Sequence, residues 1–270
     1  MREALFRSAV YGAAFAGLYA LAVLTPVGQL VDGASLGSFA FLRSEEWMPV
    51  YALRDPGALL LCICAAVAIL VAGLRGRPAP AIRASVLVGA TVVVNVVLDL
   101  VLVRPPLAES GYDYNTFPSG HAAVSVAAVV AVAWTRSEKT RPMYIAALSV
   151  GSFLVAVFSL LSFAHRASDI VAGLLLVGAL AGLIRVVGFR KPSNTAPIPA
   201  PPRSRGIGIT FALVLSAAVA ILIVGVVYPQ GATEWFVGVS MVLACAGLIL
   251  EIVSRAWRES RPSGVDDSDQ

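Results

Sequence analysis

Long apolar stretches separated by short polar segments dominate the chain. Each stretch has 17 or more residues, and a helix needs about 20 residues to cross the ~30 Å hydrocarbon layer of a bilayer. The stretches cover approximately residues 9–28, 57–74, 84–103, 119–135, 143–164, 169–188, 207–228 and 235–253. The pattern therefore predicts an all-α, polytopic membrane helical bundle with eight transmembrane helices.

The polar segments indicate how this bundle is organised. Residues 189–206 contain five prolines and several basic residues, which favours a cytoplasmic linker. We therefore expect a six-helix core over 1–188, the Pro-rich linker over 189–206, a two-helix transmembrane hairpin over 207–254 and a disordered cytoplasmic tail over 255–270. The hairpin has no catalytic signature and is a candidate docking surface for a membrane protein partner.

Composition supports a membrane protein and excludes a soluble globular domain. Hydrophobic residues make up 58% of the chain, charged residues make up 13%, and the mean hydropathy is +0.84. A net charge of +4 could suggest nucleic acid, but the positive charges follow membrane topology instead. If the N-terminus is cytoplasmic, 16 of the 20 Lys and Arg residues lie on the cytoplasmic side, and only Arg43, Arg54, Arg104 and Arg166 lie on the outer side. Because positive residues concentrate on the cytoplasmic side of membrane proteins, both termini are predicted to be cytoplasmic.

Cysteine and arginine usage narrow the class further. Cys62, Cys64 and Cys245 fall within predicted spans, where we expect them to fill space. A Cys-x-Cys metal fragment is the weaker alternative, because thiols two apart on a helix do not face each other. Arginine outnumbers lysine 18 to 2, which favours a bacterial genome rich in G and C. The first stretch lacks a clear cleavage site and is expected to remain as the first helix of a multi-pass cell-membrane protein.

Polar and ionisable residues gather at the outer ends of the third to sixth predicted spans. His121 and His165 are the only two histidines in the chain, and both lie there. In chain order the group consists of Arg104-Pro105, Pro118-Ser119-Gly120-His121, His165 and Asp169. Ionisable residues at a membrane edge indicate function by default, although helix caps or interfacial anchors are an alternative for the histidines.

In order and spacing, these residues resemble the type 2 phosphatidic-acid phosphatase family over roughly residues 90–175. That family includes bacterial phosphatases acting on phosphatidylglycerol phosphate and undecaprenyl diphosphate, as well as haloperoxidases. The matching pieces are Arg-Pro at 104–105, Pro-Ser-Gly-His at 118–121 and His-x-x-x-Asp at 165–169. The expected six-helix core agrees with the membrane branch of the family.

The resemblance implies a mechanism that uses a histidine nucleophile and needs neither a metal nor another cofactor. His165 would attack phosphorus and form a phosphohistidine. Asp169 would accept the other ring N–H of His165 and fix its tautomer. His121 would protonate the leaving oxygen and afterwards activate water, as general acid and general base.

The phosphate would be bound from two directions. The resemblance assigns Arg104 as a fork that holds the phosphoryl group. It also implies that the helix start formed by Pro118, Ser119 and Gly120 presents backbone N–H groups to a phosphate oxygen. Asp99, an acid within the third span, could pair with Arg104, bind a substrate hydroxyl or only serve helix packing.

Two cationic positions of the family's pattern are missing. The lysine seven residues before the first-motif arginine is replaced by Val97, and the arginine six residues before the third-motif histidine is replaced by Ser159. Arg166 could supply one charge to a bound substrate, with a solvent-facing interfacial residue as the alternative. Arg43 or Arg54 could fold over the site.

We therefore expect a membrane lipid phosphatase or phosphotransferase that acts on a polyprenyl or phospholipid phosphate or diphosphate at the extracytoplasmic face. Its partners would be the lipid phosphate and the bilayer, not nucleic acid. The alternative is a weakened or inactive relative that binds a lipid head group or serves as a subunit of a membrane complex. The missing cations favour this alternative, and the intact nucleophile and acid oppose it. The interpretation as a transporter or channel is supported only by the number of predicted spans.

Overall fold

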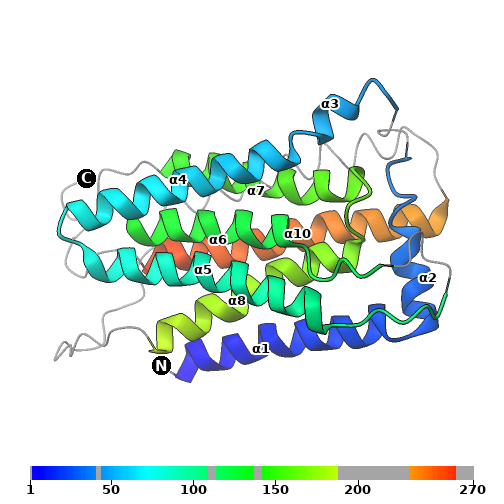
Figure 1. Ribbon diagram of the computed structural model, residues 1–270, viewed down its shortest axis with the longest axis horizontal. Coiled ribbons are helices and arrows are strands. Elements are labelled where there is room, and N and C mark those ends of the chain that lie inside the picture. Colours follow the sequence, from blue (N-terminus) through cyan, green and yellow to red (C-terminus); the bar gives the residue numbers. More distant parts are fainter. Residues whose placement is uncertain (1, 41–43, 109–113, 137–141, 188–230, 260–270) are drawn as a thin grey trace, which may run out of the picture.

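Helices pack side by side into one elongated bundle in the computed structural model of the protein (Figure 1). The structure describes residues 2–40, 44–108, 114–136, 142–187 and 231–259, and these residues form no strand. The predicted all-α class is confirmed for this part of the chain. The expected linker at 189–206, the expected span at 207–228 and the last residues of the expected tail, 260–270, lie outside the described residues.

The membrane-spanning helices follow the apolar stretches of the sequence. In chain order they are α1 (Arg2–Leu18) continued by the π-helix η1 (Tyr19–Val23), α3 (Met48–Tyr51) leading into α4 (Arg54–Leu74), α5 (Pro78–Val101), α7 (Pro142–Leu161), α8 (Ala167–Val187) and α10 (Ala232–Glu259). Within the described residues, 6 spans are thus long and apolar enough to cross a membrane, and α6 (Gly120–Thr135) is a shorter apolar helix of 16 residues. The protein is thus a multi-pass membrane protein, while the predicted total of eight spans is not confirmed.

The first predicted span, residues 9–28, is wrong at both ends. The helix begins at Arg2 and ends at Val23, and α2 (Pro26–Ala34) starts a new helix almost at once. Thr25 causes the break: its backbone is extended, and its hydroxyl accepts the N–H of Gly28 at 2.9 Å as an N-terminal cap. A single capping residue between apolar neighbours barely changes the average hydropathy, so the pattern did not reveal the break between the two helices.

The innermost helix is α6. Most of its residues are buried, and α4, α5, α7, α8 and α10 all pack against it. In α10, the side chains of Val242, Cys245 and Ile249 are fully buried. This helix continues to Glu259, past the point at which the tail was expected to begin. In contrast, large apolar side chains on α4 and α5 remain exposed, as expected for helices that face lipid.

Glycine in α8 allows this helix to approach its neighbours closely. A Cβ atom on Gly173 would lie only 2.6 Å from the carbonyl oxygen of Ser119 and 3.2 Å from the backbone nitrogen of Ala123. A Cβ atom on Gly178 would lie 2.8 Å from the ring of Tyr11 on α1. Small residues let membrane helices pack backbone to backbone. Gly173 thus allows the start of α8 to lie directly against the start of α6, and Gly178 allows α8 to lie against α1.

One end of the bundle holds the residues of the sequence motifs. The first turns of α4, α6 and α8 and the last turns of α5 and α7 meet there, and α2 lies across this end, at the right of Figure 1. The sequence motifs therefore converge from several helices on one end of the molecule.

Candidate functional site

The first turn of α6 is fixed by two backbone contacts with its surroundings. Ser119 is the N-cap residue, and its own backbone N–H donates to the carbonyl oxygen of Asp169 at 2.8 Å. The amide side chain of Asn95 on α5 donates to the carbonyl oxygen of Pro118 at 3.1 Å. The Ser119 amide, expected to contact phosphate, is therefore already bonded. The amides of Gly120 and His121 in the same turn are the ones that suit an anion.

The imidazole of His165 is held in the turn between α7 and α8. The backbone N–H of His165 donates to the carbonyl oxygen of Ser159 at 3.1 Å, which closes the end of α7. Its ring Nδ1 lies 3.1 Å from the carbonyl oxygen of Thr116. Because a carbonyl only accepts, Nδ1 carries the proton, and the lone pair is on Nε2. Nε2 is thus the nitrogen available as a nucleophile.

The environment of His165 keeps this ring neutral. Burial lowers its pKa to about 4, and the nearby charges of His121 and Arg54 act in the same direction. The hydrogen bond to Thr116 and the carboxylate of Asp99 oppose the shift but are outweighed. At neutral pH the ring is therefore uncharged, as a nucleophile must be.

The second histidine faces the first turn of α4. His121 Nε2 lies 3.2 Å from Asp55 Oδ1, and Arg54 Nε donates to the same oxygen at 2.6 Å. Arg54 Nη1 also donates to the hydroxyl of Ser162 at 3.0 Å, next to the turn that carries His165. Arg54 acts electrostatically on both histidines. The sequence suggested that Arg43 or Arg54 could fold over the site. Arg54 lies beside it, and Arg43 is outside the described residues.

The guanidinium of Arg104 is enclosed by two carboxylates. It donates to Asp32 Oδ2 at 3.1 and 3.2 Å and to Asp169 Oδ1 at 3.1 Å, and only 2% of the side chain is exposed. Asp99, considered as its partner from the sequence, is instead exposed at the end of α5. The guanidinium of Arg104, which was expected to hold phosphate, thus donates its hydrogen bonds to protein carboxylates.

Asp169 binds several groups other than the ring of His165. The hydroxyl of Thr116 donates to its Oδ2 at 2.5 Å, and the backbone N–H of Arg166 donates to the same oxygen at 2.9 Å. The distance from His165 Nδ1 to Asp169 Oδ2 is 3.9 Å, which is too long for a hydrogen bond. The direct orienting contact on His165 comes from the Thr116 carbonyl, and Asp169 supports it through the Thr116 hydroxyl.

Asp32 is a member of the site that the motifs do not reveal. It lies on α2, where its Oδ1 accepts the backbone N–H of Ser168 at 3.0 Å and its Oδ2 accepts the hydroxyl of Ser168 at 2.7 Å. Burial, together with the charge of Asp169, raises its pKa to about 6. Its only sequence signal is that it is an acid within residues 29–42, a mostly apolar stretch between two predicted spans.

The remaining predicted residues divide into buried and exposed ones. Arg166 is fully buried beside Asp169, so the solvent-facing alternative is wrong. Ser159 is also fully buried, and its hydroxyl donates to the carbonyl oxygen of Val155 within α7 at 2.8 Å. Val97 is 49% exposed on α5. Neither Val97 nor Ser159 brings a cation, so the two positive charges of the family pattern remain missing at these positions.

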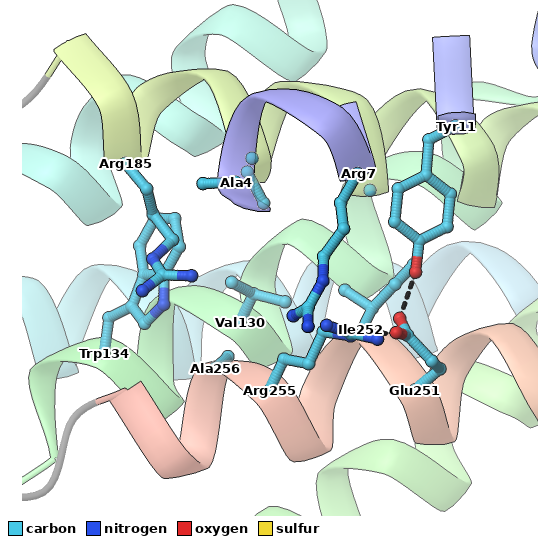
Figure 2. Close-up of a pocket in the computed structure, with 13 residues that line it drawn as sticks. Ala4, Arg7, Tyr11, Val130, Trp134, Arg185, Glu251, Ile252, Arg255 and Ala256 are labelled. Atoms are coloured by element: carbon cyan, nitrogen blue, oxygen red, sulfur yellow. Dashed lines mark hydrogen bonds and ion pairs between the residues drawn. The ribbon is translucent and has the colours of Figure 1, made fainter. Parts of the chain in front are cut away.

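A cavity lies at the opposite end of the bundle from the histidines. Figure 2 shows it between α1, α6, α8 and α10, with Arg7, Arg185 and Arg255 directed toward it. Its volume is about 400 Å³ including its opening. Glu251 in its wall accepts the hydroxyl of Tyr11 and pairs with Arg255. None of the residues around His121 and His165 lines this cavity, so it is separate from the candidate site.

Comparison with known proteins identifies one family. The model of the PAP2 superfamily matches residues 53–192, which is more than half of the chain. This range contains both histidines, Arg54, Arg104 and Asp169, but not Asp32. No curated protein and no solved structure gives a significant match.

Proposed function

Because the chain belongs to the PAP2 superfamily, whose members are generally phosphatases, we propose that it is a membrane lipid phosphatase or phosphotransferase with a histidine nucleophile. The observation that carries this proposal is the state of His165. Its Nδ1 is bonded to a carbonyl, its ring is neutral, and a second histidine lies close enough to act on it electrostatically. These are the requirements for nucleophilic attack assisted by a separate acid.

In the proposed reaction, Nε2 of His165 attacks phosphorus and a phosphohistidine forms. When the substrate is bound, His121 takes up a proton from solvent beside the carboxylate of Asp55 and gives it to the leaving oxygen. His121 then takes a proton from water or from an acceptor hydroxyl, which attacks phosphorus and breaks the P–N bond. The Thr116 carbonyl holds the Nδ1 proton of His165 throughout and keeps Nε2 directed at the substrate.

We further propose that the reaction takes place at the extracytoplasmic face and on a lipid, with polyprenyl or phospholipid phosphates or diphosphates as the substrate class. The distribution of arginine and lysine supports the orientation. The position of the site at one end of the helices supports a lipid, because the tail of the substrate can remain between apolar helices while its phosphate reaches the histidines.

A second candidate function is binding of a lipid head group without turnover, alone or as a subunit of a membrane complex. The observation that favours it is the enclosure of Arg104 by Asp32 and Asp169, which removes a cation that a phosphatase site would use. The neutral nucleophile and its neighbouring acid oppose it, since binding alone requires neither.

Purified protein incubated with a panel of lipid phosphates and diphosphates distinguishes the two candidates. The unmodified chain should release or transfer phosphate, and His165→Ala and His121→Ala should each lower the rate by at least about a hundredfold. Glu3→Gln, at the other end of the bundle, is the control and should keep full activity. If all four proteins bind the lipids equally and turn none over, the binding function replaces the catalytic one.

A further inference from the structure

The charges buried at the site balance one another. Arg104 and Arg166 provide two positive charges, and Asp32 and Asp169 provide two negative ones, all in fully or nearly fully buried side chains. We call these four residues the buried quartet. Two carboxylates share the guanidinium of Arg104, and the four formal charges sum to zero, so the quartet presents no net positive charge to a substrate.

The charges that remain accessible beside the histidines are negative in sum. Arg54, whose side chain is 18% exposed, is paired with Asp55, which is 63% exposed. Asp99 is exposed at the end of α5 and lies close enough to His165 to act on it electrostatically. In the resting site both rings are uncharged, because burial disfavours the protonated form of each. One accessible cation thus faces two accessible carboxylates.

This balance disfavours a phosphomonoester. A monoester carries up to two negative charges near neutral pH, since its second pKa is ~6. A phosphodiester carries only one. Placing a second charge about 4 Å from an uncompensated carboxylate is unfavourable even in water, and more so in a partly buried site.

Resting on the function proposed above, we propose that the substrate is a lipid phosphodiester and not a phosphomonoester, that Arg54 binds its single charge, and that Asp55 positions His121. Arg54 is suited to this because its Nη1 reaches Ser162 at 3.0 Å, next to the His165 turn, while its Nε holds Asp55 at 2.6 Å. It thereby stands between the nucleophile and the acid. Asp55 and Asp99 suit a second ester group that carries hydroxyl or ammonium donors.

The reaction balances as a hydrolysis or transfer of a diester. Nε2 of His165 forms a bond to phosphorus, the bond from phosphorus to one ester oxygen breaks, and His121 protonates that oxygen, releasing an alcohol. The phosphohistidine still carries the other ester group. Water or an acceptor hydroxyl then attacks, gives its proton to His121 and breaks the P–N bond. The products are an alcohol and a phosphomonoester, or a new diester when the acceptor is an alcohol.

The test compares kcat/KM for diesters and a monoester in the same detergent micelles. Phosphatidylglycerol and phosphatidylethanolamine are the diesters, phosphatidic acid is the monoester, and both possible alcohol products are measured. At least one diester should be preferred by about fivefold or more, the effect of one unit charge at ~4 Å in water. Preference for phosphatidic acid would overturn this inference and leave the proposed function intact. Turnover of a polyprenyl diphosphate together with no turnover of any of the three would also overturn this inference alone, and no turnover of any lipid in the larger panel would overturn both.

Charge-removing variants then test the assigned residues. Asp99→Asn should shift the ratio of monoester to diester turnover toward the monoester by about fivefold, and Glu3→Gln should leave it unchanged. Asp55→Asn should shift the ratio in the same direction and also move the alkaline limb of the pH profile of kcat/KM to lower pH, because His121 loses its partner. Arg54→Gln should lower kcat/KM for both ester classes, with partial recovery in Arg54→Lys. Unchanged ratios in both Asp→Asn variants, or full activity in Arg54→Gln, would contradict the assignment.

Discussion

The neutral imidazole of His165 leads to a definite pH dependence. Burial disfavours the protonated ring and lowers its pKa to about 4, and only the neutral ring can attack phosphorus. Acidification through the ordinary histidine range should therefore leave most of the nucleophile active.

We predict that the part of the acid limb of kcat/KM due to the nucleophile has its midpoint near pH 4 and not near 6.5. Initial rates with a diester substrate between pH 4 and 8 should therefore stay at their plateau down to about pH 5 and fall by about half at pH 4, because the charge on a diester does not change over that range. A midpoint near 6.5 would mean that His165 is exposed to water in the working enzyme.

Asp32 and Asp169 compete for the guanidinium of Arg104, and this competition predicts how stability depends on pH. The raised pKa of Asp32 means that the folded protein binds a proton there more tightly than the unfolded chain does. Stability due to this group is present below pH 3.8 and is lost as the pH rises through about 6. At pH 8 the charged carboxylate of Asp32 therefore lowers the stability of the folded protein.

Asp32→Asn, which mimics the protonated acid, should become more favourable relative to the unmodified chain as the pH rises. Between pH 4 and pH 8 the difference in unfolding free energy should change by about 2–3 kcal/mol in favour of Asn. Thermal unfolding in detergent at both pH values measures it, with Glu3→Gln as the control. A change in favour of the unmodified chain would show that Arg104 stabilises the charged form of Asp32.

The sequence identified His121, His165, Arg104 and Asp169 because each belongs to a short motif at a span end. It did not identify Asp32, which is 72 residues from Arg104 in the chain and carries no spacing signal. The hydrogen-bond partners of these residues could not be predicted from the sequence either. Whether Asp169 bonds to the ring of His165 or to Thr116 depends on differences of about an ångström that only packing determines.

The start of α8 sets the geometry of the site through Gly173. This glycine lies against backbone atoms of Ser119 and Ala123, which cannot rotate away as a side chain would. The preceding turn of α8 provides Asp169, whose carbonyl oxygen accepts the N–H of Ser119. A methyl group at residue 173 would separate the two helix starts.

Gly173→Ala should lower the unfolding free energy by about 1–3 kcal/mol and reduce turnover, because overpacking forces backbone shifts. Gly89→Ala on α5 is the matched control, since a Cβ atom there meets nothing within 4 Å. Thermal unfolding and kcat of the two variants provide the comparison. Equal behaviour of both variants would contradict the proposed close packing.

Helix limits were predictable where hydropathy changes sharply and not where a cap interrupts an apolar run. The limits expected for α7 and α8 are within a few residues of those observed, because charged or polar residues flank them. The limits of α1 and α2 were missed because Thr25 and Pro26, a cap and a helix-starting proline, lie within an apolar stretch.

The orientation of the whole bundle in the membrane can be tested with cysteine labelling. The positive residues predict that the end with α2 and the histidines faces outward and that the turn between α4 and α5 faces the cytoplasm. Glu46 and Arg75 are exposed at these two ends.

In a variant with Cys62, Cys64 and Cys245 replaced by alanine, Glu46→Cys should react with a membrane-impermeant maleimide on intact cells. Arg75→Cys should react only after the cells are lysed. The reverse pattern would place the site in the cytoplasm and remove the support for an extracytoplasmic reaction.

Trapping the covalent intermediate tests the role of His165 most directly. Enzyme mixed briefly with labelled substrate, quenched under alkaline conditions that preserve phosphohistidine and digested to peptides should carry the phosphoryl group on the peptide containing His165. His165→Ala should carry none. A chain that turns over its substrate while the label is absent, or lies on another residue, would contradict the assignment of His165 as the nucleophile.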